Sequence, residues 1–250
     1  AGDVVTLETE NGGAVIADIA PRRNIFVRPP MANLTCCSSW QAPPSPPPRT
    51  LVLDKLSAIA VDKGVQPVIV CTKGDLAEAE FLRSAYEKST SFIRIDYATG
   101  EGLDDIRHWI NGRLCAFCGN SGVGKHLLNA LLPDVECQTA AISQKLGRGR
   151  HTTREVTIFE AFGGRIADTP GFASLEASRA GFIPKENLEH AFPEFGPTSR
   201  GQFTGCSHRS EKGCAVRAAL AEGKLSQTRY DSYCAMYDEV KDVKEWQRRG

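Results

Sequence analysis

Apolar and polar residues alternate near the start of the chain in two short stretches, which are separated by Asn-Gly-Gly at residues 11–13. Alternation with a period of two is typical of half-buried strands, and a short glycine-containing connection joins such strands into a hairpin. A further strand-like stretch follows at 20–30. The pattern predicts a small β module over residues 1–34.

The next stretch carries five prolines between residues 43 and 48. Proline lacks the backbone N–H that strands and helices use, and dense prolines favour an extended polyproline conformation. We therefore predict a Pro-rich linker over 35–50, with a Pro-rich ligand motif as the alternative.

From residue 51 the period of the apolar positions changes repeatedly between helical and strand-like. Alternating helices and buried strands indicate a parallel sheet with crossover helices, hence an α/β fold. Beyond about 175 the pattern is helical. The predicted helices span 51–64, 76–89, 102–114 and, near the C-terminus, 237–249; the predicted strands span 66–71, 91–96, 115–118, 155–162 and 164–168.

Composition narrows the class of protein. Thirty basic and thirty acidic side chains cancel, so only local patches can favour nucleic acid. The sequence has no apolar run of the roughly 20 residues that a membrane span needs, and its first residues do not resemble a signal peptide. We expect a cytoplasmic protein with reduced cysteines, in which Cys115 and Cys118 are core residues of a strand rather than a redox or zinc pair.

The stretch GNSGVGKH, 119–126, follows a predicted strand and precedes an apolar helical run. Its G-x-x-x-x-G-K spacing predicts a loop whose backbone N–H groups surround phosphates, with lysine adding a positive charge. His126 occupies the position where Ser or Thr usually supplies a hydroxyl to magnesium. The candidate nucleotide-binding residues are Gly119, Asn120, Ser121, Gly122, Val123, Gly124, Lys125 and His126.

Two further motifs follow predicted strands. In DTPG, Asp168 is a candidate magnesium ligand and the N–H of Gly171 would meet the γ-phosphate; an ordinary Pro-Gly turn is the alternative. In TKGD, the Asp75 carboxylate can accept two hydrogen bonds from guanine, whereas adenine lacks that donor pair. Lys73 would lie over the base, and an ordinary turn is again the alternative. The candidate residues of this motif are Thr72, Lys73, Asp75 and Leu76.

The order of these motifs is unusual, because TKGD precedes the other two whereas in common GTPases it follows them. Circular permutation of a compact domain explains this order. With LDKL, TKGDL, TGEGLDDI, GNSGVGK, GRHTTREV, DTPGF, FPEF and CSHRSEKGCAV in sequence, the chain resembles the RsgA/YjeQ family of circularly permuted, ribosome small-subunit-dependent GTPases.

The resemblance implies a partial OB-fold-like β module over 1–34, a circularly permuted P-loop GTPase domain over 51–175 and a C-terminal helical zinc-type domain over 176–250. It also implies GTP hydrolysis in late maturation of the small ribosomal subunit. The expected partners are GTP or GDP, the small subunit and its rRNA, and the expected cofactors are Mg²⁺ and Zn²⁺. We expect a monomer.

The resemblance also assigns GRGRHTTREV to the switch that covers the γ-phosphate. Thr152 or Thr153 would sense magnesium, and His151 would lie near the attacking water. A flexible basic loop that touches rRNA phosphates is the alternative. Phe172 replaces the glutamine that many GTPases use to position water, which implies slow intrinsic turnover.

The chain departs from the family pattern at four places. Thr72 replaces Asn of N-K-x-D, Asp96-Tyr97 replaces Ser-Ala near the base, and His126 removes the magnesium hydroxyl. The fourth place is the zinc motif C-x4-C-x-H-x5-C, in which Gly201 occupies the first ligand position. Cys206, His208 and Cys214 supply the other three positions, and Cys234 is a candidate for the fourth ligand; a thiol cluster with an incidental surface histidine is the alternative.

Two other functions remain open at this point. The departures favour a nucleotide-binding or rRNA-binding module with little or no hydrolysis, whereas the glycines, Lys125, Asp75 and Asp168 favour an enzyme. An adenine-nucleotide enzyme is a third possibility, which would remove Asp75 from its role.

Overall fold

The computed structural model describes residues 1–10, 13–26, 30–41, 50–72, 76–119, 131, 156–168, 183–196 and 206–243. The strands are β1 (Val5–Glu10), β2 (Gly13–Ile19), β3 (Ile25–Phe26), β4 (Met31–Ala32), β5 (Cys36–Gln41), β6 (Gln66–Thr72), β7 (Ser91–Ile95), β8 (Leu114–Gly119), β9 (Thr157–Ala161) and β10 (Gly164–Asp168). The helices are α1 (Thr50–Asp62), α2 (Leu76–Tyr86), α3 (Leu103–Ile110), α6 (Lys185–Leu188), the 3₁₀ helix η3 (Pro193–Phe195), α7 (Ala215–Ala221) and α8 (Gln227–Val240).

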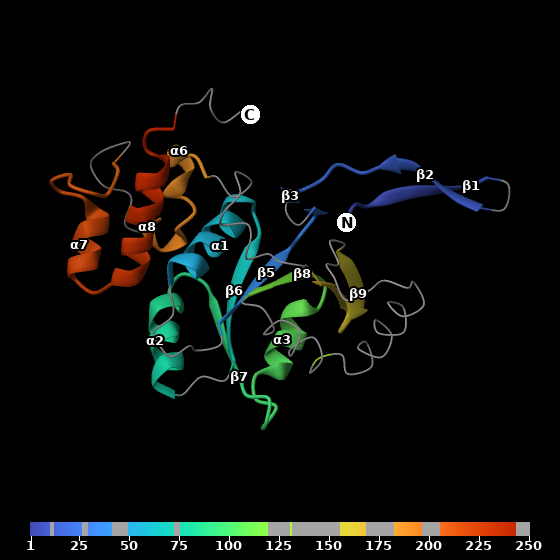
Figure 1. Ribbon diagram of the computed structural model, residues 1–250, viewed down its shortest axis with the longest axis horizontal. Coiled ribbons are helices and arrows are strands. Elements are labelled where there is room, and N and C mark those ends of the chain that lie inside the picture. The colour runs from blue at the N-terminus through green and yellow to red at the C-terminus, as the bar shows by residue number, and fades with distance from the viewer. Residues whose placement is uncertain are drawn as a thin grey trace, which may run out of the picture.

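A six-stranded sheet forms the centre of the molecule, in the order β7-β6-β5-β8-β10-β9 (Figure 1). All neighbouring pairs are parallel except β9 and β10, which form an antiparallel hairpin. The predicted α/β fold is confirmed. The expected helices and strands of this part are present, with bounds that differ by a few residues.

The predicted linker over 35–50 is wrong for Cys36–Gln41, because this segment is β5, paired on both sides with β6 and β8. Its sequence, CCSSWQ, has neither the alternation nor the β-branched residues that mark a strand. Backbone hydrogen bonds to two neighbours stabilise it instead, and these cannot be read from side-chain patterns. The prolines of residues 43–48 lie outside the described residues.

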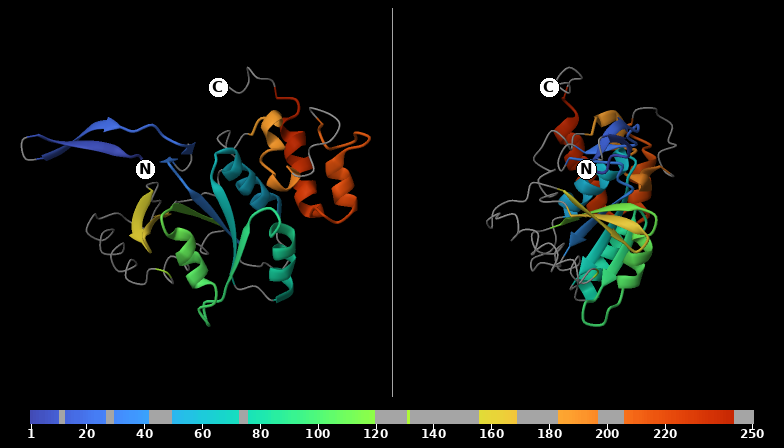
Figure 2. Two further views of the ribbon diagram at one scale, coloured as in Figure 1. Left: turned by 180° about the vertical axis from the view of Figure 1, so that it is seen from behind. Right: turned by 90° about the vertical axis from the view of Figure 1, so that its right-hand side faces the viewer.

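Helices cover both faces of the sheet (Figures 1 and 2). Val68 and Val70 of β6 pack with Ile106 of α3 on one face, whereas Ile69 packs with Leu82 of α2 on the other. The α1 helix lies on the same face as α2. Among the described residues, no helix has the length and apolar character to cross a membrane.

The C-terminal helices pack against α1 through an apolar core that includes Phe192, Phe195, Tyr233 and Ile59. The long C-terminal helix, α8, begins at Gln227, well before the predicted start at 237, and residues 244–250 lie outside the described part. The predicted start came too late because residues 227–236 include several polar side chains and show no clear apolar stripe.

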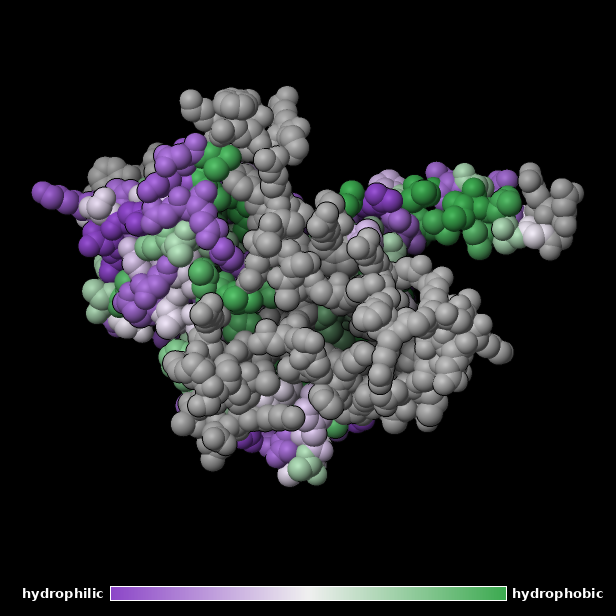
Figure 3. Space-filling model, viewed as in Figure 1, coloured by the Kyte–Doolittle hydropathy of each residue, from purple (hydrophilic) through white to green (hydrophobic). Residues whose placement is uncertain are grey.

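The predicted N-terminal hairpin is confirmed as β1 and β2, which pair antiparallel and project from the rest of the molecule (Figure 1). Apolar side chains gather on it (Figure 3), including Leu7 and Ile16, which are 59% and 63% exposed. A two-stranded ribbon cannot bury such residues by itself. An exposed apolar surface of this kind is typical of one that contacts another element or molecule.

A buried ion-pair cluster joins the C-terminal helices to the sheet domain. Arg229 of α8 is 3% exposed; its Nη1 lies 2.7 Å from Asp54 Oδ1 of α1, and its Nε lies 2.7 Å from Glu194 Oε1 of η3. The guanidinium also lies over the rings of Phe192 and Tyr86, at 4.7 and 5.5 Å from their centroids. Burial raises the pKa of Asp54, and the Arg229 charge opposes that effect.

The turn between β7 and α3 restricts which residues can occupy positions 100 and 102. Gly102 has a φ of +78°, and a Cβ at this residue would lie 1.9 Å from the carbonyl oxygen of Arg94. Gly100 in the same turn has a φ of +79° but has nothing within 4 Å of a Cβ. Glycine is therefore required at 102 by both backbone conformation and space, and at 100 by conformation alone.

We expect Arg229→Met to lower the free energy of unfolding by about 3–5 kcal/mol, because Asp54 would remain buried without its charged partner. Denaturant unfolding measures the change. Arg83→Met is the matched control, since Arg83 pairs with Glu87 on the surface of α2 and should contribute at most about 1 kcal/mol. Equal effects of the two substitutions would contradict a special role of the buried cluster.

Gly102→Ala should destabilise the protein by about 3 kcal/mol, the sum of a left-handed conformation and an overlap with backbone. Gly100→Ala should cost only about 1 kcal/mol, because it has only the conformational term. Thermal or denaturant unfolding of the two variants checks the difference. If Gly100→Ala proved the more destabilising, the close packing of Gly102 on Arg94 would be disproved.

Candidate functional site

The three sequence motifs begin at one edge of the sheet. The strands β6, β8 and β10 run parallel and end at Thr72, Gly119 and Asp168. The register aligns Asp168 with Phe117 and Gln41 with Cys71, so these strand ends lie close to one another along the sheet. In open α/β sheets, ligands bind in the crevice beyond the carboxyl ends of the strands.

Most of the predicted nucleotide contacts lie outside the described residues. The structure describes the backbone at Gly119 and Asp168, the whole of Thr72, and Leu76 as the first residue of α2. The predicted residues outside the described part are Lys73, Asp75, Asn120, Ser121, Gly122, Val123, Gly124, Lys125, His126, His151, Thr152, Thr153 and Gly171.

Two departures from the family pattern meet inside the fold. Thr72 is 1% exposed at the end of β6, and Tyr97 follows the end of the neighbouring strand β7. The Tyr97 ring packs against the apolar cluster beneath α3, which accommodates its extra bulk. Its hydroxyl is buried, and burial raises the pKa of Tyr97 to about 12, opposed by the neighbouring Thr72 side chain.

Asp96, which precedes Tyr97 in the same departure, stabilises a turn. Its Oδ1 accepts a hydrogen bond from the N–H of Ala98 at 2.8 Å, and its backbone carbonyl accepts one from Gly100 at 2.9 Å. A short acidic side chain commonly closes a turn in this way, and Ser can do the same. The Asp96 substitution therefore fits the local backbone of the loop that leads to α3.

The predicted metal ligands do come together. One side-chain donor atom from each of Cys206, His208 and Cys214 lies within 4.8 Å of the others. His208 is 3% exposed, so the alternative of an incidental surface histidine is wrong. Among the described residues the group contains these three only; Cys234 does not belong to it, and Gly201 lies outside the described part.

The loop that carries these ligands is held by neighbours that the sequence did not indicate. Glu211 accepts hydrogen bonds from the backbone N–H groups of Ser207 and Arg209, at 2.8 and 2.9 Å. Burial alone would raise the pKa of Glu211, but hydrogen bonds from the Ser207 hydroxyl and from backbone N–H groups, including those of Ser207 and Ser210, lower it to about 2. Tyr230 and Tyr233 of α8 donate to the carbonyls of His208 and Ser207, so the loop is attached to that helix.

The chemistry of the donors suits zinc, which binds thiolate sulfur and imidazole nitrogen in tetrahedral structural sites. Burial raises the pKa of the Cys206 thiol to about 11, so this thiol is protonated at neutral pH without a cation nearby. Metal binding there would release protons. The three donors fit zinc and leave one coordination position to a further ligand.

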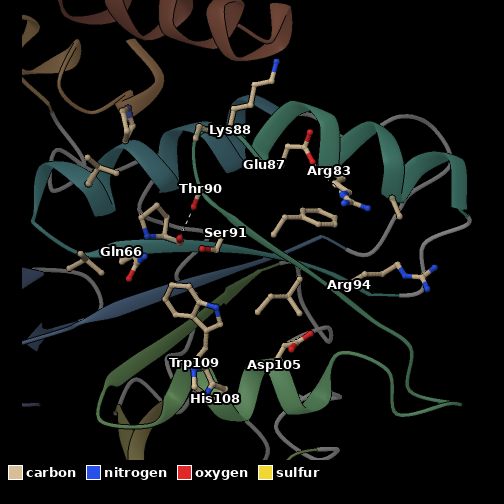
Figure 4. A pocket seen from close by; sticks show the side chains of 18 of the residues that line it. Gln66, Arg83, Glu87, Lys88, Thr90, Ser91, Arg94, Asp105, His108 and Trp109 are labelled. Carbon is tan, nitrogen blue, oxygen red and sulfur yellow. Dashed lines mark hydrogen bonds and ion pairs between the residues drawn. The ribbon is translucent and has the colours of Figure 1, made fainter. Parts of the chain in front are cut away.

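A wide groove elsewhere on the molecule has a different character. It runs along the edge strand β7 between α2 and α3, with Arg83 and Lys88 on one side and Asp105 and Trp109 on the other (Figure 4). Its lining extends from Gln66, the first residue of β6, to Arg94 near the end of β7. Acidic and basic side chains are mixed in it, and it shows no convergence of groups for catalysis.

Several known proteins are similar to this chain in sequence. A family model described as RsgA GTPase matches residues 19–178. A curated small ribosomal subunit biogenesis GTPase RsgA from Geobacillus kaustophilus is 39% identical over 96% of this chain and 83% of its own length. The protein of that name from Streptococcus pneumoniae is 36% identical over 98% of this chain and 83% of its own length.

Two solved structures have a similar fold. YjeQ from Thermotoga maritima gives a TM-score of 0.81 at 29% identity, covering 97% of this chain and 84% of its own. YloQ, described as a circularly permuted GTPase, gives 0.77 at 29% identity, covering 97% of this chain and 81% of its own. The family model spans more than half of the chain, and relatives above 30% identity align along nearly all of it; the chain therefore belongs to the RsgA GTPase family.

Proposed function

We propose that this chain is a GTPase that acts in maturation of the small ribosomal subunit. The observation that carries the proposal is the convergence of β6, β8 and β10 at one edge of the sheet, although TKGD precedes the other two motifs in the chain. The names of the relatives support the small subunit as the partner. We further propose contact with its rRNA, a monomeric state and a cytoplasmic location.

We assign the nucleotide-binding roles motif by motif. The N–H groups of 119–125 surround the phosphates, with Lys125 between the β and γ phosphates. Asp75 accepts two hydrogen bonds from guanine, and Lys73 lies over the base. Thr72 ties the guanine-reading turn to the loop of Tyr97, because Thr72 ends β6 and Tyr97 follows the end of the neighbouring strand β7.

For hydrolysis, we propose in-line attack of water on the γ-phosphate. Lys125 and the loop amides stabilise the developing charge, the Gly171 N–H meets the γ-phosphate, and His151 lies near the water. Asp168 and one of Thr152 and Thr153 are the oxygen donors for magnesium, which in such sites neutralises charge on the β and γ phosphates. His126 offers nitrogen instead of oxygen, which weakens the magnesium site.

In the C-terminal part, we propose that Cys206, His208 and Cys214 hold a structural zinc ion. Its chemistry there would be to cross-link the 206–214 loop. The support is the proximity of the three donors and the burial of His208. The proposed domain division is a partial OB-fold-like module, a permuted GTPase domain that includes β5, and a helical zinc-type domain from about residue 176.

Asp75→Asn should reduce the preference for GDP over ADP by about 1–3 kcal/mol, because an amide cannot accept both guanine donors. Competition titration of the two nucleotides measures the preference. Asp18→Asn is the control, since Asp18 is exposed on β2 of the projecting hairpin and belongs to none of the nucleotide motifs. A wild-type chain that binds GDP and ADP equally would instead support an adenine-nucleotide enzyme.

His126→Ser should raise magnesium-dependent single-turnover GTP hydrolysis about tenfold or more, equivalent to about 1.4 kcal/mol of transition-state stabilisation. The assay is run with and without small ribosomal subunits, which we expect to stimulate both proteins. His108→Ser, on the exposed face of α3, is the control. Normal GDP affinity without any stimulated hydrolysis, in wild type and variant alike, would support a binding module instead of an enzyme.

A further inference from the structure

The two ring nitrogens of His208 face different partners. Nδ1 lies 3.3 Å from Cys214 Sγ, on the side of the thiol pair. Nε2 lies 3.4 Å from Oε2 of Glu189, on the opposite edge of the ring. A neutral imidazole that binds a cation through one nitrogen must carry its proton on the other. The two nitrogens of His208 are therefore in different environments, with a sulfur atom facing Nδ1 and a carboxylate facing Nε2.

The ring of His208 is fixed in this orientation. Phe195 and Tyr233 pack against it with centroid distances of 5.8 and 5.9 Å. Its backbone has a φ of +58°, an uncommon conformation for a residue with a side chain, and its carbonyl accepts the Tyr230 hydroxyl at 2.6 Å. Because the ring cannot turn freely, the group that faces Nε2 determines which nitrogen is protonated.

Glu189 is the residue that faces Nε2 and can determine which nitrogen of His208 is protonated. It follows α6 (Lys185–Leu188) and so belongs to a different segment from the ligand loop, with a side chain that is 28% exposed. Its contact with Nε2 is within ion-pair distance but lacks the geometry of an ordinary hydrogen bond, so Nε2 remains a buried polar atom without one. Among the described acidic residues, Glu189 is the one within ion-pair reach of the ring.

We propose that Glu189 is a positioning residue of the metal site, whose carboxylate, 3.4 Å from Nε2, accepts the Nε2–H of His208 when a metal binds and thereby presents Nδ1 as the metal-binding atom. The inference rests on the proposed zinc site. A carboxylate behind a metal-binding histidine fixes its tautomer and makes the ligating nitrogen more basic. Glu211, the other carboxylate of this region, has a different role, since its oxygens accept backbone N–H groups.

The test uses the full chain with Zn²⁺ or Co²⁺ as the probe. Zinc affinity is measured by competition with a chromophoric chelator in the wild type and in Glu189→Gln and Glu189→Ala. We expect the affinity to fall about 10-fold to 100-fold in Glu189→Ala and less in Glu189→Gln, because an amide oxygen still accepts a hydrogen bond. Glu222→Gln is the matched control, since Glu222 pairs only with Lys224 on the surface among the described contacts.

A second measurement separates positioning from general stabilisation. In ¹⁵N-histidine spectra of the zinc-loaded chain, His208 should show a metal-bound Nδ1 and a slowly exchanging Nε2–H. Faster exchange of that proton is expected in Glu189→Ala, while the unfolding midpoint of the metal-free chain changes little. Glu211→Gln should instead destabilise the loop with and without metal, because it removes contacts to the backbone.

The outcomes are distinct. Unchanged zinc affinity and unchanged Nε2–H exchange in both Glu189 variants would overturn this inference and leave the zinc site standing. A wild-type chain that binds neither Zn²⁺ nor Co²⁺ would overturn the zinc site and this inference together, while the proposed GTPase activity would be unaffected.

Discussion

The buried charge of Arg229 is the constraint on which the arrangement of the described helices depends. A guanidinium with 3% exposure is tolerated only where carboxylates balance it, and these come from α1 and η3, far apart in the chain. Moving α8 away from α1 would leave Asp54 buried without a counter-charge. The C-terminal helices are therefore attached to the sheet domain by a requirement of charge as well as by apolar packing.

The helix α2 connects this buried cluster to the proposed nucleotide site. That helix begins at Leu76, directly after the TKGD turn, and ends at Tyr86, whose ring lies beneath the Arg229 guanidinium. The far end of the helix is thus packed against the same cluster that anchors α8. The turn proposed to read guanine is therefore followed by a helix that packs on the sheet and whose last residue contacts the buried cluster of the C-terminal helices.

The sequence predicted the features that follow from local residue patterns. These are the alternation of helices and strands, the N-terminal hairpin of β1 and β2, and the motifs at the strand ends. It missed β5, because a central strand of Cys and Ser is held by backbone bonds on both sides and carries no clear side-chain signal. It could not pair Asp54 with Arg229 or Glu189 with His208, since such contacts join segments that only folding brings together. For the metal site, the ligand spacing was visible in sequence but the residues that orient the ligands were not.

The departures from the family pattern differ in their physical consequences. Asp96 closes a turn with its own side chain. Tyr97 packs its ring against the interior beside the buried Thr72, although the geometry of its buried hydroxyl gives no hydrogen bond to a described residue. The described backbone and interior accommodate all three side chains next to the proposed base-binding region. His126 has a different consequence, because it changes the chemistry of the magnesium site. Imidazole cannot supply the hard oxygen ligand that this cation prefers. The chemical step, more than nucleotide binding, is therefore where this chain should differ from its relatives.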